Sequence, residues 1–283
     1  MTGSFQVQIV AMVVGAMCLI VGGDVAGRML TDAGFSPFFV AWARFALAAV
    51  VLFPICGLRA GELQMLRRPA LILRAFLIAG GIACILTALK TEEMATVFGG
   101  FFVGPIVSYA LSALVLKERV TIPRTVLLMV SFGGVLLVVR PGFGMTPGLG
   151  FALLAGCFHG CYLVTTRWLA GAYRPRFLLL SQLVIGALVL APTAIGPMPE
   201  ITLPLAGFIV ISAMGSALGN LLLVLANRRA EASVIAPFIY SQIIIATVYG
   251  FAFFGEWPDP VALLGLGIII AAGVGSVLAT RRT

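Results

Sequence analysis

His159 is the only histidine of the chain, and it lies in the middle of a long apolar run with Tyr162 one turn further along. Polar side chains are costly inside a bilayer, so a histidine there is expected to face protein or water rather than lipid. The ring could hydrogen-bond a small molecule, or bind and release a proton near neutral pH. A hydrogen bond between two helices is an equally weighted alternative. Cys157 and Cys161 share a helix face that His159 does not, so no metal site is predicted.

Polar and aromatic side chains in four other apolar runs are candidates for the same site. Tyr240, Ser241 and Gln242 form the densest polar cluster in any run, while Ser216 and Asn220 share one helix face. A small zwitterion needs a few well-placed dipoles and some apolar surface. The remaining candidates that could supply these are Thr87, Phe101, Phe102, Ser108 and Tyr109. The alternative for the hydroxyls and amides is hydrogen bonding between helices. For the two phenylalanines the alternative is simple packing or lipid contact, and this is the preferred interpretation.

Asp24 and Arg44 are the charged residues nearest the interior of the apolar runs. A structural ion pair is the preferred interpretation, because buried charges usually find a partner. The alternative is that Arg44 attracts a substrate carboxylate. Glu118 and Glu256 lie at the ends of runs, where solvation and local pairing explain them. No carboxylate lies in the middle of a run, so a carboxylate proton relay is not expected.

The elements that must position these residues follow from composition. The chain has 283 residues, of which 61% are hydrophobic and 10% charged, whereas a typical soluble domain carries roughly 25% charged residues. The apolar runs are long and do not alternate as membrane strands do, and a helix spans a bilayer with about 20 residues. We therefore predict an all-α integral membrane protein with a single membrane transport domain over residues 1–283. Its ten expected transmembrane helices cover about 6–27, 36–58, 71–89, 95–116, 122–139, 148–170, 177–195, 203–226, 233–254 and 261–280.

The distribution of basic residues predicts the orientation. Fourteen of the 18 Lys and Arg residues fall in connections or at span ends on the side of the N-terminus, three fall on the other side, and Arg44 lies deeper within a span. Lys and Arg concentrate on the cytoplasmic side of membrane proteins. Both termini are therefore predicted to be cytoplasmic, in a bacterial inner membrane. The net charge of +8 is assigned to this asymmetry, and no nucleic-acid partner is expected.

An internal repeat is visible when the chain is shifted by about 138 positions. Gly81 then meets Gly219 and Glu118 meets Glu256. Two copies of five spans, about 6–140 and 148–280, would be inverted with respect to each other because five is odd. We expect two inverted five-helix repeats around a central cavity. Gly99 and Pro237 fall at equivalent places and, with Pro105, are candidate hinges, although structural kinks without a ligand are equally weighted.

Five short motifs, in order along the chain, carry a resemblance to a known family. They are Arg44-Phe45, Pro105, Leu116-Lys117-Glu118-Arg119, the segment Gly134-Val135-Leu136-Leu137-Val138-Val139-Arg140-Pro141, and Phe254-Gly255-Glu256. Together they resemble the EamA-type transporters of the drug/metabolite transporter superfamily, and among these the bacterial amino-acid exporters. The resemblance implies ten helices in two inverted repeats, with a cavity lined mainly by the first, third, fourth, sixth, eighth and ninth spans.

These observations predict a secondary transporter that exports small organic solutes by alternating access, with amino acids as the preferred cargo. Drugs or other metabolites are the alternative cargo, and a membrane-embedded enzyme is less favoured because acids and histidines do not cluster. No Gly-Lys pair of a phosphate-binding loop occurs, so no nucleotide or other cofactor is expected. The expected partners are a small-molecule substrate and the lipid bilayer, with monomer and homodimer both open. Facilitated transport or exchange is expected, or weak proton coupling through His159.

Overall fold

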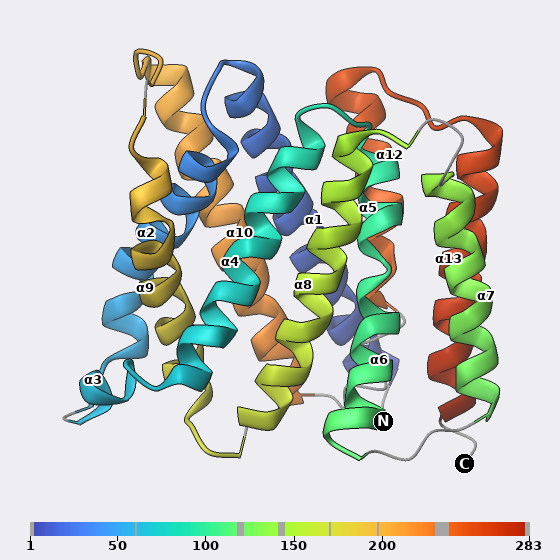
Figure 1. Cartoon of the computed structure of the whole chain (residues 1–283), viewed down its shortest axis with the longest axis horizontal. Helices are drawn as coiled ribbons and strands as arrows, with labels where there is room; N and C mark the ends of the chain where they lie inside the picture. The colour runs from blue at the N-terminus through green and yellow to red at the C-terminus, as the bar shows by residue number, and fades with distance from the viewer. Residues whose placement is uncertain are drawn as a thin grey trace.

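The computed structural model of the protein describes residues 3–59, 61–117, 122–140, 145–169, 171–196, 198–229 and 238–280, and it is helical without a strand in those ranges (Figure 1). The helices up to residue 140 are α1 (Gly3–Asp32), α2 (Pro37–Cys56), the short α3 (Glu62–Met65), α4 (Pro69–Leu89), α5 (Met94–Phe101), α6 (Gly104–Val115) and α7 (Ile122–Val139). Those that follow are α8 (Pro147–Leu169), α9 (Pro175–Ala194), α10 (Leu203–Arg229), α12 (Ser241–Phe254) and α13 (Pro260–Thr280).

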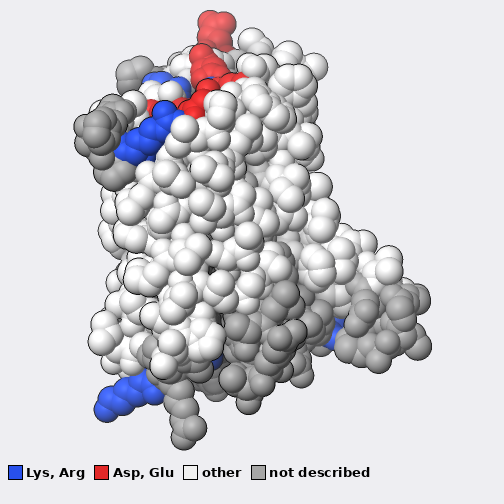
Figure 2. All heavy atoms as spheres, turned by 90° about the vertical axis from the view of Figure 1, so that its right-hand side faces the viewer, with Lys and Arg blue, Asp and Glu red and all other residues white. Residues whose placement is uncertain are grey.

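Seven helical segments of the described residues are long and apolar enough to cross a bilayer. Three further apolar helices of 10–17 residues, Thr125–Val139, Ser241–Phe254 and Pro260–Gly275, lie where the fifth, ninth and tenth spans are expected. In the face shown in Figure 2, Asp and Glu gather at one end and an uncharged surface separates that end from the other. The end where Asp and Glu gather is called the acidic end. It is formed by the connections that hold Asp32, Glu92, Glu93, Glu256 and Asp259. The all-helical class predicted from composition is thus observed, with helices of the length and hydropathy that a bilayer requires.

Helix boundaries follow from local sequence. The Ser36 hydroxyl accepts a hydrogen bond from the Phe38 amide at 3.3 Å, and Pro37 occupies the first turn of α2, where its missing N–H costs nothing. Gly255 ends α12 with φ of 68°, a left-handed conformation that glycine adopts without strain. The Glu256 amide then donates to the Gly250 carbonyl at 3.1 Å, which fixes where the Glu256 side chain emerges.

Four close helix pairs organise the bundle, namely α1 with α10, α4 with α8, α2 with α9, and α7 with α13 (Figure 1). Each pair joins one helix from the first half of the chain to one from the second half. The α1–α10 contact depends on the motif Gly215-Ser216-Ala217-Leu218-Gly219. A Cβ atom on Gly215 would lie 2.6 Å from the Leu19 carbonyl oxygen, and one on Gly219 would lie 2.7 Å from that of Ala16. Small residues four apart therefore let the two backbones touch.

The fourth expected span is interrupted. Helix α5 ends at Phe101 and α6 begins at Gly104, with Pro105 in its first turn. Gly99 lies within α5, where an added Cβ would come 2.7 Å from Val138 Cγ1, so it permits close packing against α7. Pro237, the third candidate hinge, lies outside the described residues.

Candidate functional site

A cavity of about 70 Å³ lies between α2, α4, α8, α9 and α10. Since roughly 10–15 Å³ suffices for one water molecule, it has room for several. It lies near helix midpoints, as shown by His159 at the centre of the 23-residue α8. The wall is largely apolar, and no carboxylate is among its described lining residues. Its polar lining residues are Arg44, His159, Tyr162, Gln182, Ser216 and Asn220.

Four of the residues predicted from sequence meet in this cavity: His159, Tyr162, Ser216 and Asn220. The His159 ring centroid lies 5.0 Å from that of Phe101 and 5.9 Å from that of Tyr162. Neither ring nitrogen has a hydrogen-bond partner in the described part of the chain. The Asn220 amide nitrogen donates to the Ser216 carbonyl at 2.8 Å, which leaves its Oδ1 free to accept from a ligand. The cavity thus offers unpaired polar atoms from both α8 and α10.

A chain of hydrogen bonds borders the cavity between α4, α8 and α9. Arg74 donates to the Thr166 hydroxyl at 2.8 Å, to the Leu178 carbonyl at 2.8 Å and to the Tyr162 phenol oxygen at 2.9 Å. The Tyr162 hydroxyl in turn donates to Gln182 Oε1 at 2.8 Å. The Arg74 guanidinium also lies 4.8 Å from the centre of the Tyr162 ring. The position of Tyr162 and Gln182 in the cavity wall is therefore fixed from behind by a buried cation.

Arg44 borders the cavity but is occupied by other partners. Its guanidinium donates to Asp24 Oδ1 at 2.6 Å, to the Gly23 carbonyl at 2.7 Å and to the Ser212 hydroxyl at 2.8 Å. Both charged side chains are about 5% exposed. The structure thus pairs Asp24 with Arg44, as the preferred interpretation of the sequence had it, and ties α2 to α1 and α10.

The other candidates do not line the cavity. Thr87 donates to the Ala83 carbonyl of its own helix, and the Tyr109 hydroxyl lies 2.8 Å from Thr125 Oγ1 on α7. The Phe102 ring packs against Tyr240 with centroids 5.0 Å apart. Phe101 touches the site only through His159. The remaining candidates away from the cavity are Ser108, Ser241 and Gln242.

Sequence reasoning missed Gln182 and undervalued Arg74. Both were visible as polar residues inside apolar runs, Gln182 next to Ser181 in α9 and Arg74 in α4. Intramembrane polar residues are functional candidates by default, so the same criterion that selected His159 would have found them.

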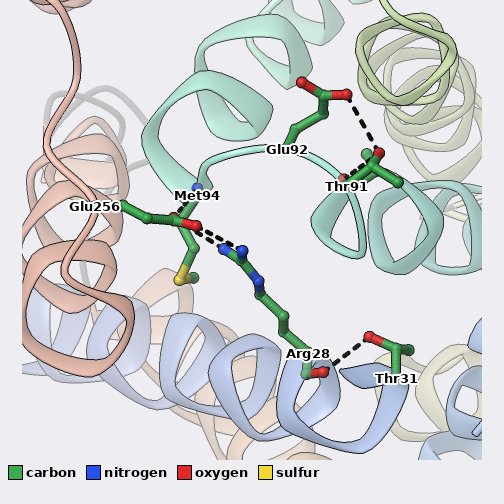
Figure 3. Close-up of polar contacts among 7 residues, drawn as sticks. Arg28, Thr31, Thr91, Glu92, Met94 and Glu256 are labelled. Carbon is green, nitrogen blue, oxygen red and sulfur yellow. Dashed lines mark hydrogen bonds and ion pairs between the residues drawn. The ribbon is translucent and has the colours of Figure 1, made fainter. Parts of the chain in front are cut away.

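Polar contacts join the halves of the chain at the acidic end (Figure 3). Arg28 of α1 makes two hydrogen bonds to the Glu256 carboxylate, of 2.5 and 2.8 Å, and its guanidinium lies 4.2 Å from the centre of the Phe254 ring. Glu256 Oε2 also accepts from the Met94 amide at the start of α5, at 3.1 Å. Glu256 thereby connects α1, α5 and the segment between α12 and α13. We call this group of Arg28, Glu256 and the Met94 amide the latch.

Two further contacts tie the same end together. The Glu92 carboxylate accepts from the Thr91 hydroxyl at 3.2 Å and from that of Thr146, just before α8, at 2.5 Å. Arg140, just after α7, forms an ion pair with Asp259 at the start of α13. Backbone amides of α13, then the Arg140 guanidinium, hold the pKa of Asp259 below its usual value.

At the opposite end, Glu62 of α3 accepts two hydrogen bonds from Arg174, of 2.7 and 2.8 Å. It also accepts from the Arg59 amide at 2.8 Å. The Arg174 guanidinium first, and this amide second, lower the pKa of Glu62 below its usual 4.5. The pair joins the short α3 segment to the start of α9.

Comparison with known proteins agrees with this architecture. Two S-adenosylmethionine uptake transporters are similar to the chain: the protein from Rickettsia bellii is 26% identical over 238 residues, covering 83% of this chain and 81% of the relative. The protein from Rickettsia prowazekii is 23% identical over 249 residues, covering 87% and 84%. A solved crystal structure superposes with a TM-score of 0.66 over 96% of this chain and 98% of its own, at 15% sequence identity, and so supports the fold.

The sequence model of the EamA-like transporter family matches the chain twice, over residues 7–140 and 146–278. These two matches cover most of the chain, and they confirm the family that the motifs predicted. The protein is a multi-pass membrane protein, and it belongs to the EamA-like transporter family.

Proposed function

We propose that the protein is a secondary transporter of small organic metabolites that carry an amino-acid group, working by alternating access across a bacterial inner membrane. The observation that carries the proposal is the cavity at the helix midpoints, lined by unpaired polar atoms of α8 and α10 and by helices from both halves. Small-molecule sites combine apolar walls with a few placed polar groups in this way.

Ten helices in two inverted repeats are the architecture we propose. The family matches at 7–140 and 146–278 nearly coincide with the repeats expected at 6–140 and 148–280. Exchanging the halves turns the α1–α10 contact into the α8–α4 contact, and returns the α2–α9 and α7–α13 contacts to themselves. Both kinds of pair are close in the structure, which supports an internal two-fold relation. Inverted repeats commonly rock about a central site to expose it to each side in turn.

The latch suggests which side of the cavity is closed in this conformation. With the acidic end facing outward, as the positive-inside rule predicts, Arg28 and Glu256 hold the outer ends of helices from both halves together. The outer side of the cavity would then be closed in this conformation. Reporter tags at the two termini should both lie in the cytoplasm, and tags on opposite sides would contradict the ten-helix arrangement.

Amino acids, or metabolites built on them such as S-adenosylmethionine, are the proposed cargo. The expectation of amino acids came from the sequence, and the named function of the relatives adds a substrate that carries an amino-acid group. Other metabolites or drugs are the alternative cargo. Alternating access is reversible, so the expected export and the relatives' uptake require only opposite gradients.

We propose that transport is driven by the substrate gradient, as facilitated transport or exchange, with at most weak proton coupling through His159. No carboxylate lines the cavity among the described residues, so His159 is the one side chain there to which we assign a proton-carrying role. A flux that collapses without a pH gradient, yet persists in His159→Ala, would contradict this part of the proposal.

The decisive experiment is counterflow in proteoliposomes that hold the purified protein. Vesicles loaded with one unlabelled amino acid, or with S-adenosylmethionine, should accumulate the labelled compound faster than protein-free vesicles. Folded protein that moves none of these compounds would overturn the proposed substrate class.

A further inference from the structure

Arg74 is a buried cation with neutral partners. It is 4% exposed, and its three hydrogen bonds go to two hydroxyls and one carbonyl. No carboxylate in the described part of the chain lies within ion-pair distance of it. Arg44, the other buried arginine, is neutralised by Asp24 at 2.6 Å. Of the two buried arginines in the described part of the chain, Arg44 is thus neutralised and Arg74 keeps an uncompensated charge.

Tyr162 transmits this charge to the cavity wall. Its oxygen accepts from Arg74 and its hydroxyl donates to Gln182 Oε1. A phenol that accepts from a cation becomes a stronger donor, because successive hydrogen bonds polarise one another. Since Oε1 is taken, the Gln182 amide presents its Nε2 donor, which has no acceptor among the described residues. Gln182 lines the cavity and is 7% exposed, so this donor is available to a ligand.

The cavity treats the two charged groups of a zwitterion differently. A carboxylate would meet the Gln182 donor, which is linked through the Tyr162 hydroxyl to the Arg74 cation, and electrostatic attraction is strong at low dielectric. An ammonium group would meet only neutral acceptors such as Asn220 Oδ1. The wall therefore favours binding of the negative group.

We propose that the Gln182 amide binds the substrate's carboxylate, and that Arg74, acting through Tyr162 and Gln182 as a positioning residue, makes the transporter prefer carboxylate-bearing substrates over their uncharged or decarboxylated analogues. This inference rests on the proposed function and names the chemical group that the same site recognises. It also assigns carboxylate recognition to Arg74 rather than to Arg44, which the sequence left open.

The test compares three forms of one transported amino acid in counterflow: the free acid, its primary amide and the decarboxylated amine. The native protein should favour the acid over the amide by roughly tenfold or more in half-saturation concentration, as expected for a charge-assisted hydrogen bond. Arg74→Gln should bring this ratio close to one, and Arg74→Lys should keep part of it because the charge remains. Arg67→Gln is the matched control, since Arg67 is an exposed arginine near the same end of α4, and its ratio should not change.

The ratio distinguishes recognition from a structural role. If Arg74→Gln lowers the flux of acid and amide equally, Arg74 is only a structural clamp and the inference fails. Equal transport of acid and amide by the native protein would overturn the inference while leaving the proposed transport function intact. Absence of flux for all three forms, and for every other amino acid, would count against the proposed function itself.

A second variant guards against poor folding of Arg74→Gln. Tyr162→Phe removes the hydroxyl between the guanidinium and Gln182 but keeps the ring. It should reduce the preference for the acid several-fold, by about the worth of one or two hydrogen bonds. An unchanged preference in Tyr162→Phe would overturn the proposed path from Arg74 to the substrate.

Discussion

Arg28 and Glu256 lie 228 positions apart in the chain, and their side chains form an ion pair with hydrogen bonds of 2.5 and 2.8 Å. The contact joins α1 in the first half to the segment before α13 in the second. Because Glu256 also accepts from the Met94 amide at the start of α5, three elements converge on one carboxylate. We therefore expect this group to resist separation of the three elements at the acidic end.

A double-mutant cycle should detect the latch. Arg28→Gln, Glu256→Gln and the double variant should show a coupling free energy on the order of 1–3 kcal/mol in thermal unfolding, because both side chains are mostly buried and the hydrogen bonds are charge-assisted. Arg140 and Asp259 provide the matched control. Their side chains are 41% and 51% exposed, so the corresponding cycle should give less than about 1 kcal/mol. Equal coupling for the two pairs would contradict a special role for the latch.

Removing one partner of the Asp24–Arg44 pair should lower the stability of the protein more than removing one partner of the latch. Asp24→Asn leaves a buried guanidinium without its counter-charge, and such a loss typically costs about 3–5 kcal/mol. Arg44→Lys should also destabilise the protein, since one ammonium group does not reproduce hydrogen bonds to Asp24, Gly23 and Ser212. Melting temperature in detergent is the measurement. A stable Arg44→Lys protein that has lost transport would instead favour direct contact between Arg44 and substrate.

Glu62 should make stability depend on acid pH. Because Arg174 lowers its pKa in the folded protein, the folded state binds the proton less readily than the unfolded state. The stabilisation is therefore complete above the usual pKa of 4.5 and is lost as the pH falls through the lowered value. The difference in melting temperature between the native protein and Glu62→Gln should stay constant at neutral pH and shrink in acid. A difference that grows on acidification would refute the assignment.

His159 should affect substrate affinity more than folding. His159 lines the cavity, and its ring nitrogens have no hydrogen-bond partner among the residues that the structure describes, so His159→Ala removes a group available to the substrate. We expect the half-saturation concentration in counterflow to rise roughly fivefold, the worth of one hydrogen bond. Thr87→Val is the control, because the Thr87 hydroxyl bonds the Ala83 carbonyl of its own helix and should leave the affinity unchanged. The same change in both variants would argue for a general effect on packing.

The membrane class and the Asp24–Arg44 contact could be predicted from sequence, because few environments suit so apolar a chain and few partners are available to two buried charges. An apolar composition leaves the bilayer as the main environment, and two charges deep in neighbouring apolar runs have few other partners. His159, Tyr162, Ser216 and Asn220 were found for a similar reason, as polar residues on the inward faces of two helices.

The rest of the site depends on packing that no single helix encodes. Tyr240 is a polar residue of the expected ninth span, yet its ring packs against Phe102, which lies in the break between α5 and α6. Gln182 enters the cavity only because α9 lies beside α2 and α4. Neighbouring helices set the rotation of each helix about its axis. Because the surfaces of these helices are almost uniformly apolar, their sequences give little indication of which face points inward.

The bare backbone contact between α1 and α10 also limits how this chain can evolve. At 215 and 219 any side chain would strike a main-chain oxygen of α1, so random mutagenesis with selection for folded protein should recover almost nothing but glycine there. Gly207, in the same helix, has no atom within 4 Å of an added Cβ, so it should drift freely and even gain from alanine. Within one helix, positions 215 and 219 would thus stay glycine because α1 touches them, whereas position 207 would vary because nothing constrains it.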